Sequence, residues 1–449
     1  MPATGTPTAG SARVGRWLAR ALRAHRAGAL DEAGRLYRRV LAARPGHPDA
    51  LHYLGVLAHQ RGHGDEALAL IGRALAADPR YVDAHNNLGN VHKESGRLEE
   101  AEACYRRTLA IAPHADAMSN LAVVLEAQGR LDEAFEAYGA LLRHVPDHAR
   151  GHYLLGLFLR NHAQDEAHAR QSVECFRTAW RLDQGSLRVL EALGVGLYML
   201  GRHDEAREVY ADWLRREPDS PLARHMLAAC GGSAPPPRAA DDYVRELFDG
   251  FADSFDEQLL KNLDYRAPQL VADALAAHVP AAGAALEVLD AGCGTGLCGP
   301  FLRPLARRLT GVDLSPGMVE KARARGGYDT LVVDELTAFL VARPDTWDVI
   351  VSADTLVYFG ELDAVAAAAF GALRPGGWLA FTVEALPADA DRVELGVSGR
   401  YRHGRAHVRR ALASAGFEVV RLDAAELRKE AGEAVSGWVV LARRAAAAR

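Results

Sequence analysis

A motif that recurs about every 34 residues constrains the first half of this 449-residue chain more than any other feature. Each copy has an alanine, a large apolar residue four positions later and a proline twelve positions later. The alanines of the first four copies lie 34, 34 and 33 residues apart. Such self-similarity indicates a repeat architecture. The copies are DEAGRLYRRVLAARP (31–45), DEALALIGRALAADP (65–79), EEAEACYRRTLAIAP (99–113), DEAFEAYGALLRHVP (132–146) and DEAREVYADWLRREP (204–218).

Each copy predicts a pair of packed helices. A glycine precedes the alanine by twelve residues in three copies, at Gly55, Gly89 and Gly194. Small residues at these two positions let the helices approach closely, the large apolar residue fills the space above, and proline ends the second helix. A further copy is degenerate, because Ser172 replaces the alanine after a four-residue insertion, although Gly156 and Phe176 remain.

These matched positions resemble the tetratricopeptide repeat, with six copies over about residues 14–218 and a capping helix in PLARHMLAACG. The resemblance implies a curved superhelix whose inner groove is lined by the first helix of each pair. Asn87 recurs as Asn120 in the same register, and Asn90 lies on the same helix as Asn87. Asparagine can donate to and accept from an extended peptide backbone, as the similar superhelix of O-GlcNAc transferase does. The alternative is that these asparagines satisfy neighbouring helices.

One break in composition divides the chain, which is too long for a single ordinary domain. The segment CGGSAPPPRAADD (230–242) combines glycines and prolines that suit neither helix nor a paired strand. We therefore predict a repeat domain over 14–230, a semi-rigid linker over 231–242 and a second domain over 243–449.

The second half alternates short apolar runs with helical segments, which predicts an α/β domain with a mostly parallel sheet. Two final runs without a helix between them predict an antiparallel hairpin at the sheet edge, which brings the expected total to seven strands. The expected strands are 286–292, 308–314, 329–335, 347–354, 377–384, 417–427 and 437–444, and the expected helices between the first five are 299–308, 316–325, 335–343 and 362–373.

A glycine-rich loop, LEVLDAGCGTGLCGP (286–300), follows the first expected strand. Its spacing is G-x-G-x-G, whereas a dinucleotide-binding loop prefers G-x-G-x-x-G with a helix that receives a pyrophosphate. Asp290 before the glycines would repel a pyrophosphate but suits a ligand that carries an ammonium or a sulfonium. Asp313 ends the second strand, where it can accept both ribose hydroxyls.

VLDAGCGTG followed by GVDLSPGM resembles a class I S-adenosylmethionine-dependent methyltransferase, over roughly residues 243–443. The resemblance implies a Rossmann-like fold with S-adenosyl-L-methionine as cofactor. The segment LFDGFADSFDEQLLKNLDYRAP (247–268) resembles the lid helices of a bacterial subgroup that joins tetratricopeptide repeats to a methyltransferase. The implied cofactor contacts are Asp290, Gly292, Cys293, Gly294, Thr295 and Gly296 for the methionine part, Asp313 for the ribose, Leu314, Asp334 and Glu335 for the adenine, and Asp354; the implied pocket walls are Phe251, Phe255 and Tyr265, with helix packing as the alternative for these aromatics.

Methyl transfer is mainly a matter of alignment, and a general base helps only when the acceptor arrives protonated. Asp354, Tyr358 and His403 are candidate bases, and none is favoured. The segment after the fourth strand lacks the Asn/Asp-Pro-Pro-Tyr/Phe pattern of amino-methyltransferases, which disfavours adenine or glutamine amide as the acceptor.

A net charge near −5 and the lack of a basic stripe disfavour nucleic acid or a membrane as partner. Without a signal peptide or an 18-residue apolar run, five cysteines without framework spacing predict reduced thiols in the cytoplasm. Cys293 and Cys298 have neither a second cysteine pair nor a histidine at ligand spacing, so no metal site is expected.

The sequence thus predicts a cytoplasmic S-adenosylmethionine-dependent methyltransferase whose tetratricopeptide repeats recruit a protein or peptide partner. Its acceptor is a small molecule or a protein. Two alternatives stay open: an adaptor that senses the cofactor without strong catalysis, and an NAD-dependent oxidoreductase on a similar sheet. Fold by itself carries no substrate information.

Overall fold

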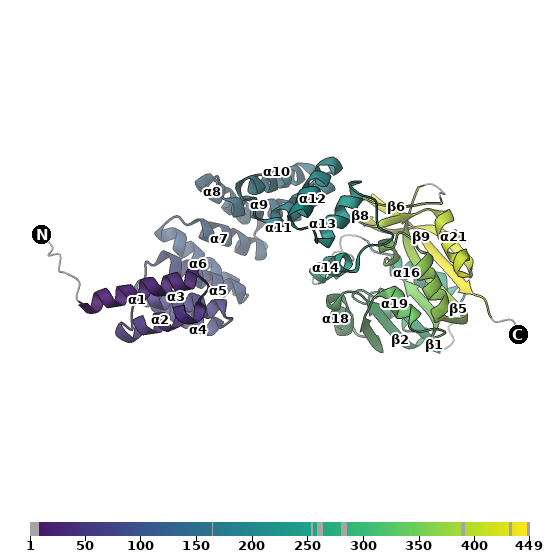
Figure 1. Ribbon diagram of the computed structural model, residues 1–449, viewed down its shortest axis with the longest axis horizontal. Helices are drawn as coiled ribbons and strands as arrows, with labels where there is room; N and C mark the ends of the chain where they lie inside the picture. The colour runs from purple at the N-terminus through teal and green to yellow at the C-terminus, as the bar shows by residue number, and fades with distance from the viewer. Residues whose placement is uncertain are drawn as a thin grey trace. The chain divides into compact units, whose positions relative to one another are not determined.

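The computed structural model describes residues 9–163, 165–252, 255–257, 264–279, 285–387, 391–430 and 433–446. The chain forms two compact units, Met1–Ala192 and Leu193–Arg449. Each is considered by itself (Figure 1).

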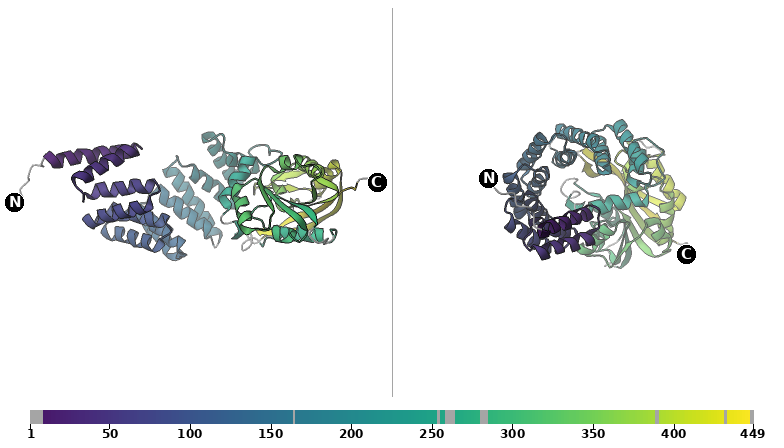
Figure 2. Two further views of the ribbon diagram at one scale, coloured as in Figure 1. Left: turned by 90° about the horizontal axis from the view of Figure 1, so that it is seen from below. Right: turned by 60° about the vertical axis from the view of Figure 1, so that its left-hand side comes forward.

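The first unit consists of helices, and they form successive antiparallel pairs, as the right-hand view of Figure 2 also shows. The division between the units falls inside the helix Leu187–Met199, labelled α11. The preceding helices are α1 (Ala9–Arg26), α2 (Leu30–Ala43), α3 (Pro48–Gln60), α4 (Gly64–Ala77), α5 (Val82–Glu94), α6 (Leu98–Ile111), α7 (Ala115–Ala127), α8 (Leu131–His144), α9 (Ala149–Asn161) and α10 (Glu166–Leu182).

The predicted close approach of paired helices is confirmed. Ala101 on α6 is fully buried, and a Cβ added at Gly89 on α5 would lie 2.6 Å from the ring of Tyr105 on α6. Because real Cβ atoms do not approach that closely, only glycine lets the tyrosine ring cover α5 at this point. The second helices end two residues before a proline where the repeat has one, as α6 does before Pro113.

The degenerate repeat keeps the same packing by a different route. Ser172 on α10 is buried, and its Oγ donates a hydrogen bond of 2.9 Å to the carbonyl oxygen of Gly156 on α9. The hydroxyl that replaces the alanine methyl is therefore satisfied inside the helix pair. Phe176 covers Gly156, as the aromatic residue does in the regular copies.

The second unit contains the end of the helical array and the α/β domain. Its further helices are α12 (His203–Arg216), α13 (Pro221–Ala229), α14 (Asp241–Phe251), α15 (Phe255–Glu257), α16 (Ala267–Ala276), α17 (Gly299–Leu302), α18 (Pro316–Arg325), α19 (Leu336–Val341), η2 (Leu356–Tyr358), α20 (Asp363–Ala372) and α21 (Arg405–Ala415). Its strands are β1 (Leu286–Ala291), β2 (Ala306–Asp313), β3 (Thr330–Val333), β4 (Trp347–Ser352), β5 (Leu373–Ala385), β6 (Val393–Leu395), β7 (Tyr401–His403), β8 (Phe417–Glu430) and β9 (Glu433–Arg444).

The sheet has the order β3-β2-β1-β4-β5, with parallel pairing between these strands. β9 pairs antiparallel with β5 and with β8, so the predicted terminal hairpin is confirmed. The described sheet has nine strands rather than the seven expected, because the short pair β6–β7 joins the end of β5. Three-residue strands are too short to produce a readable alternation.

Helices cover both faces of the sheet, whose twist is visible in the left-hand view of Figure 2. α19, α20 and α21 pack on the face that carries Leu289 and Ile350, whereas α16 and α17 pack on the face that carries Val288 and Val351. Consecutive strand residues thus point into opposite cores, which explains the continuous apolar runs in the sequence.

One expected helix is wrong in extent. The expected helix over 299–308 is reduced to α17, which ends at Leu302, and β2 already begins at Ala306. Pro304 lacks the backbone N–H that would continue the helix, so the apolar stretch after it joins the sheet instead.

The proline-rich segment before α14 is hydrogen-bonded to the α/β core. The carbonyl of Pro237 accepts from the amide of Gly360 at 2.9 Å, and Tyr401 Oη donates to the carbonyl of Pro236 at 2.7 Å. The amide of Ala239 donates to the carbonyl of Tyr358 at 2.8 Å. The backbone of this segment is therefore held against the loop that follows β4.

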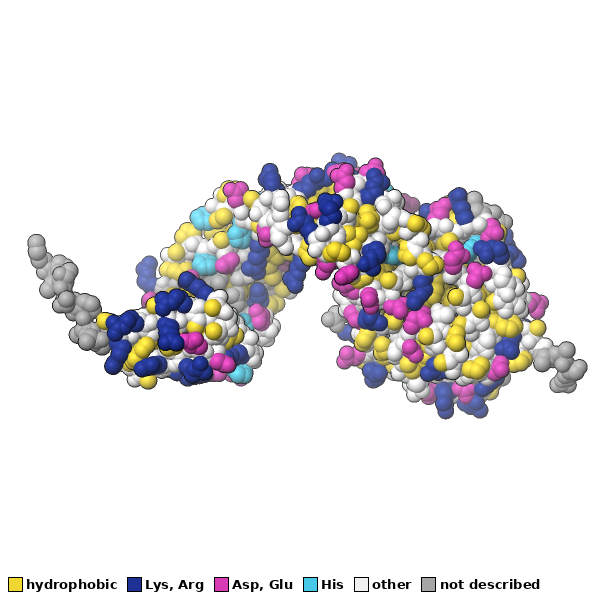
Figure 3. Space-filling model, viewed as in Figure 1, with side chains coloured by type: hydrophobic (Ala, Val, Ile, Leu, Met, Phe, Trp, Pro, Cys, Tyr) yellow, Lys and Arg dark blue, Asp and Glu magenta, His cyan; other side chains and the backbone are white. Residues whose placement is uncertain are grey.

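Both signs of charge occur on the surface of each unit, as the face drawn in Figure 3 shows. Among the described residues, no helix combines the length and the apolar character that crossing a bilayer requires.

Candidate functional site

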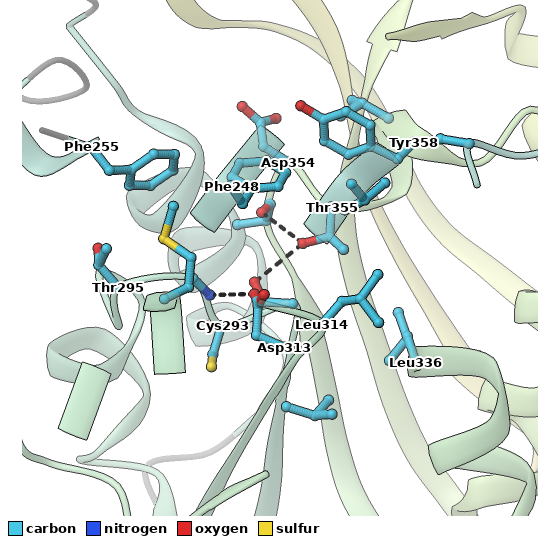
Figure 4. A pocket seen from close by; sticks show the side chains of 18 of the residues that line it. Phe248, Phe255, Cys293, Thr295, Asp313, Leu314, Leu336, Asp354, Thr355 and Tyr358 are labelled. Atoms are coloured by element: carbon cyan, nitrogen blue, oxygen red, sulfur yellow. Dashed lines mark hydrogen bonds between the residues drawn. The ribbon is translucent and has the colours of Figure 1, made fainter. Parts of the chain in front are cut away.

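A cavity lies at the carboxyl ends of β1, β2 and β4 (Figure 4). The strand order reverses between β1 and β4, and open α/β sheets bind ligands at such a position. The empty volume, open mouth included, is about 1270 Å³.

The glycine loop after β1 forms the floor of the cavity. Gly292 has φ +80° and a Cβ there would overlap the side chain of Thr355. Thr355 Oγ1 donates to the carbonyl of Gly292 at 3.2 Å, which ties the loop after β4 to the loop after β1. Gly294 has φ +50°, and a Cβ there would find only the Phe255 ring, at 3.9 Å. The backbone at Gly294 is therefore open to a ligand.

Asp313 lies where β2 ends. Its Oδ2 accepts a hydrogen bond of 2.8 Å from the amide of Gly294, and its Oδ1 accepts one of 2.9 Å from the amide of Ser315. Burial raises the pKa of the Asp313 carboxyl, whereas these two amides oppose the rise. Each oxygen has a further lone pair, so the carboxylate can accept two hydroxyl groups from the cavity.

The acidic pair after β3 has two different tasks. Both oxygens of Glu335 accept backbone amides at the start of α19, from Thr337 at 2.9 Å and from Ala338 at 2.8 Å, so this carboxylate caps a helix. Both Asp334 and Glu335 line the cavity, and among the described residues the side chain of Asp334 accepts from the amide of Glu335 alone. Leu314 and Leu336 lie side by side at this end of the cavity (Figure 4).

Asp290 and Gly296 do not line the cavity that the described residues form. Asp290 is fully buried beneath the loop, where its Oδ2 accepts a hydrogen bond of 2.6 Å from Tyr328 Oη, and no described residue pairs with its Oδ1. Burial raises its pKa to about 7, although Tyr328 opposes the rise. A Cβ at Gly296 would lie 3.1 Å from the Tyr328 ring. Both residues thus support the loop from behind.

The two cysteines of the loop line the cavity as thiols. Burial raises the pKa of Cys293 and of Cys298 well above the ordinary value, with nearby Asp290 adding to both shifts. A protonated, buried thiol is a poor nucleophile and a poor metal ligand. The described residues contain no group of three His, Cys, Asp or Glu side chains placed to hold a metal ion.

Asp354 follows β4 with a left-handed backbone, at φ +55°. Thr382 Oγ1 accepts its amide at 2.9 Å and donates to its Oδ1 at 3.1 Å, while Arg428 Nη1 donates to its Oδ2 at 2.7 Å. Burial raises the pKa of Asp354, and Arg428 opposes that rise. Strained non-glycine residues persist where their surroundings fix them, often at functional sites.

Arg428 is the centre of a buried charge cluster that the sequence analysis missed. Its side chain is 5% exposed and also contacts Glu384 and Glu430, and Arg400 contacts the same two glutamates. Charges placed in apolar strands need partners. That rule could have drawn attention to Glu384 in GWLAFTVE and to Arg428 in the following hairpin.

The other two candidate bases lie in different places. Tyr358 lines the cavity and is buried, and this burial raises its pKa. His403 does not line the cavity; it is fully buried and its Nε2 lies 2.8 Å from the carbonyl of Phe359. Burial lowers the pKa of His403 to about 4. His403 therefore supports the loop after β4 rather than facing a ligand.

Aromatic side chains form one wall of the cavity. Phe248 on α14 meets Tyr358 edge to face at 5.4 Å between ring centroids and Phe255 at 5.9 Å (Figure 4). Tyr265 also lines the cavity, and burial raises its pKa well above the ordinary value. The side chain of Phe251 lies outside the described part of the chain.

Two carboxylates fasten the segment that carries these aromatics. Asp249 on α14 accepts from Ser315 Oγ and, at 3.2 Å, from the amide of Gly317 at the start of α18. Asp256 on α15 accepts from Thr295 Oγ1 and pairs with Arg325. Thr295 lines the cavity, so Asp256 joins the aromatic wall to the glycine loop.

The asparagines of the repeats form a hydrogen-bonded ladder across α3, α5 and α7. Asn87 Nδ2 donates to His52 Nε2 at 2.8 Å, and Asn90 Nδ2 donates to Asn87 Oδ1 at 3.3 Å. Asn120 Nδ2 donates to Asn90 Oδ1 at 3.0 Å, and Asn120 is 3% exposed. The partners are side chains rather than the helix backbones considered from the sequence. Asn87 and Asn90 stay half-buried.

Comparisons with known proteins agree with this geometry. The methyltransferase domain family matches residues 288–377, which run from β1 into β5. Human (Homo sapiens) methyltransferase-like protein 27 is 34% identical over 185 residues, which are 36% of this chain and 75% of that protein. The chain belongs to the methyltransferase family. Its N-terminal part matches tetratricopeptide repeat families at residues 24–80, 54–116, 86–142, 120–173 and 187–230.

The methyltransferase domain also has relatives of which it spans less than half. Malonyl-[acyl-carrier protein] O-methyltransferase of Serratia marcescens is 32% identical over 123 residues, which are 27% of this chain and 46% of that protein. Ubiquinone biosynthesis O-methyltransferase of Xylella fastidiosa (strain 9a5c) is 32% identical over 111 residues, which are 24% of this chain and 44% of that protein. The chain is thus a fusion of tetratricopeptide repeats with a methyltransferase domain.

Proposed function

We propose that this methyltransferase takes its methyl group from S-adenosylmethionine and that its tetratricopeptide repeats recruit the protein partner or substrate. The observation that carries the cofactor is the pairing of Asp313 with the amide of Gly294 across the cavity floor. It places an acceptor for two ribose hydroxyls beside a backbone that a ligand can approach. The two named O-methyltransferase relatives favour oxygen as the acceptor atom.

The residues that line the cavity fit the shape and charge of S-adenosylmethionine. A side chain at Gly294 would occupy the space where the methionine part passes. Asp313 would hold the ribose, Leu314 and Leu336 would flank the adenine ring, and Asp334 would accept from its amino group. Carboxylates around the cavity favour a cationic sulfonium over an anionic pyrophosphate. Asp290, which is buried behind the loop, would act by holding the loop in shape.

S-adenosylmethionine supplies an electrophilic methyl group on a sulfonium, whose departure needs no protonation. The residues of the chain therefore have to orient the acceptor and exclude water. Phe248, Phe255 and Tyr358 form the apolar wall that excludes water. Asp354 and Tyr358 would hold the acceptor in this proposal, which is supported by the fact that both line the cavity beside this wall.

The recruiting role is supported by the repeats themselves, since stacked repeats present extended surfaces for partners. The asparagine ladder leaves Asn87 and Asn90 half-buried and able to exchange hydrogen bonds, whereas Asn120 is enclosed by its neighbours. The proposed contacts of a peptide are therefore Asn87 and Asn90, with Asn120 holding them in position.

Calorimetry with S-adenosylmethionine, S-adenosylhomocysteine and NAD tests the cofactor. We expect the first two to bind in the micromolar range and NAD to bind at least a hundredfold more weakly. Tight NAD binding without the other two would replace the proposal by an oxidoreductase.

Transfer of labelled methyl groups into a lysate from cells that lack the gene tests whether the protein methylates an acceptor and whether the repeats recruit that acceptor. Label in protein bands supports recruitment of a protein substrate by the repeats. Label in small molecules alone makes the repeats a regulatory module. Binding of the cofactor without any transfer would favour an adaptor that senses it.

A further inference from the structure

The acceptor end of the cavity contains two arginines that are paired with carboxylates, Arg428 through all three side-chain nitrogens and Arg400 through two of them. Arg428 donates from Nη1 to Asp354 at 2.7 Å and from Nε to Glu430 at 2.8 Å, and its Nη2 contacts Glu384. Arg400 donates from Nε to Glu384 at 2.7 Å, and its Nη2 contacts Glu430. All three nitrogens of Arg428 thus point at carboxylates, so this guanidinium has no free edge for an anionic ligand.

The cluster is also negative as a whole. Three carboxylates, those of Asp354, Glu384 and Glu430, surround two guanidinium groups, which leaves one net negative charge when all five groups are ionised. Asp354, Arg400, Arg428 and Glu430 line the cavity directly. A carboxylate or phosphate ligand here would meet a net repulsion from the cluster.

The aromatic wall, whose Tyr358 lies near this cluster, suits a flat apolar body that carries a polar group. Phe248, Phe255 and Tyr358 present ring edges and faces to the cavity. The hydroxyl groups of Tyr265 and Tyr358 have no hydrogen-bond partner within the described residues, and both tyrosines line the cavity. Neither hydroxyl is among the enclosed side-chain atoms that lack a partner, so both are accessible and can exchange hydrogen bonds with a ligand.

We infer that the methyl acceptor is an uncharged, planar, hydroxyl-bearing ring of the phenol class, and that the site excludes carboxylate acceptors. This inference rests on the proposed function and names its substrate class. A ring hydroxyl fits because it ionises near pH 10, far more readily than an aliphatic alcohol, and needs no cationic partner when it binds neutral. An amine would bind as an ammonium, whose nitrogen has no free electron pair.

The acceptor hydroxyl lies within reach of Asp354, which has a further lone pair on each oxygen beside its bonds to Thr382 and Arg428. The O–H bond of the acceptor breaks and its proton passes to the Asp354 carboxylate and then to solvent. The oxygen forms a bond to the methyl carbon, and the carbon–sulfur bond of the donor breaks with its electron pair left on sulfur. The products are an aryl methyl ether, the neutral thioether and one proton.

Equilibrium binding tests the class without turnover. The full chain saturated with S-adenosylhomocysteine is titrated by calorimetry with 2-naphthol and with 2-naphthoate, which share one ring system. We expect saturable binding of 2-naphthol and at least tenfold weaker binding of 2-naphthoate. Equal or tighter binding of the carboxylate, or no saturable binding of the naphthol, overturns the inference.

Two variants and one control test the charge cluster and the tyrosine hydroxyl separately. Glu430→Gln removes one negative charge and loosens both arginines, so 2-naphthoate binding is expected to strengthen at least threefold. Glu418→Gln, a change at an exposed glutamate of the same strand, is expected to leave it unchanged. Tyr358→Phe keeps the ring and is expected to weaken 2-naphthol binding about threefold or more. An unchanged naphthoate affinity in Glu430→Gln contradicts the charge argument.

Binding of S-adenosylhomocysteine distinguishes a failure of the proposed function from a failure of the proposed acceptor class. A variant that binds it like the unmodified chain is folded at the cavity. If the unmodified chain fails to bind S-adenosylhomocysteine, the proposed function fails. If it binds S-adenosylhomocysteine but prefers the carboxylate, only the acceptor class fails.

Discussion

The carboxylate of Asp313 accepts the backbone amide of Gly294 at 2.8 Å, which fixes the end of β2 against the loop that follows β1. This one hydrogen bond joins the two sequence motifs that lie 19 residues apart. It also leaves the second lone pair of the carboxylate oxygen directed at the cavity. The proposal that the cavity binds S-adenosylmethionine therefore depends most strongly on the side chain of Asp313.

Replacing Asp313 by asparagine should weaken S-adenosylmethionine binding roughly 10- to 100-fold, because a hydrogen bond to a charged group contributes about 1.5–3 kcal/mol. Asparagine keeps the side-chain size and one acceptor oxygen, so the fold should survive. Calorimetry measures the affinity, and Asp423→Asn, at an exposed aspartate of β8, serves as control. An unaltered dissociation constant would mean that the ribose is held elsewhere.

The contact of Asp256 with Thr295 and Arg325 should set how fast the product leaves. Asp256→Ala removes the fastening of the Phe255 segment to the glycine loop. Because the pair is about one-third exposed, its loss is worth about 0.5–1 kcal/mol, and dissociation of S-adenosylhomocysteine should accelerate two- to fivefold. Stopped-flow fluorescence measures the rate. Asp242→Ala, on the exposed side of α14, should not change it.

Two glycines of one helix pair should respond in opposite ways to alanine. A Cβ at Gly55 would lie 2.6 Å from Ile71, whereas a Cβ at Gly72 would find nothing within 4 Å. Gly55→Ala should lower the free energy of unfolding of the first unit by about 1–3 kcal/mol through overpacking. Gly72→Ala should raise it by about 0.5–1 kcal/mol, because alanine favours the helix. Urea unfolding followed by circular dichroism decides; the same sign for both would contradict the packing account.

His225 on α13 should contribute to the stability of the α/β domain itself. Its ring stacks on Tyr243 of α14 at 4.0 Å between centroids, and its Nε2 donates to the carbonyl of Gly399 at 2.8 Å. His225→Ala should lower the free energy of unfolding of the second unit by about 1–3 kcal/mol, since it removes the stacking and leaves that carbonyl unpaired. Thermal unfolding measures the loss. Arg224→Ala, on the exposed side of the same helix, should cost little.

The buried carboxyl of Asp290 predicts a pH dependence of stability. Burial raises its pKa in the folded chain to about 7 from an ordinary value of 3.8, so the folded chain holds a proton that the unfolded chain has released. The contribution of Asp290 to the free energy of unfolding is complete below about pH 4 and is lost as the pH rises to about 7. The loss is about 4 kcal/mol at most.

The matched variant for that prediction is Asp290→Asn, which keeps the contact with Tyr328 but cannot ionise. The difference in unfolding free energy between the two proteins should change in favour of the asparagine as the pH rises from 4 to 7. A difference that stays constant over this range would show that Asp290 is ionised in the folded chain.

The repeats could be predicted in detail because their information is local. The alanine, the aromatic residue four positions later and the proline lie on one helix or its end, and their spacing is fixed by 3.6 residues per turn. Ser172 shows the limit of this reasoning. Its hydroxyl is compatible with the helix pair only because the carbonyl of Gly156 accepts it, and that partner lies on another helix.

In the α/β domain, the glycine loop and Asp313 were predictable from spacing, and the cavity does run along both. The direction of each side chain was not. Asp290 and Asp334 both follow apolar runs, yet the first is enclosed beneath the loop and the second lines the cavity. Glu335 is occupied as a helix cap, and His403 points at a backbone carbonyl.

The sequence by itself determined the helix pairs, the order of the longer strands and helices without the short pair β6–β7, and the loop that a cofactor would approach, because each depends on residues close together in the chain. Only the tertiary structure decided which charges line the cavity. Arg428 and Asp354 lie 74 positions apart and meet at 2.7 Å. Such a pairing follows from the closure of the β8–β9 hairpin onto β5, and no local pattern in the sequence encodes it.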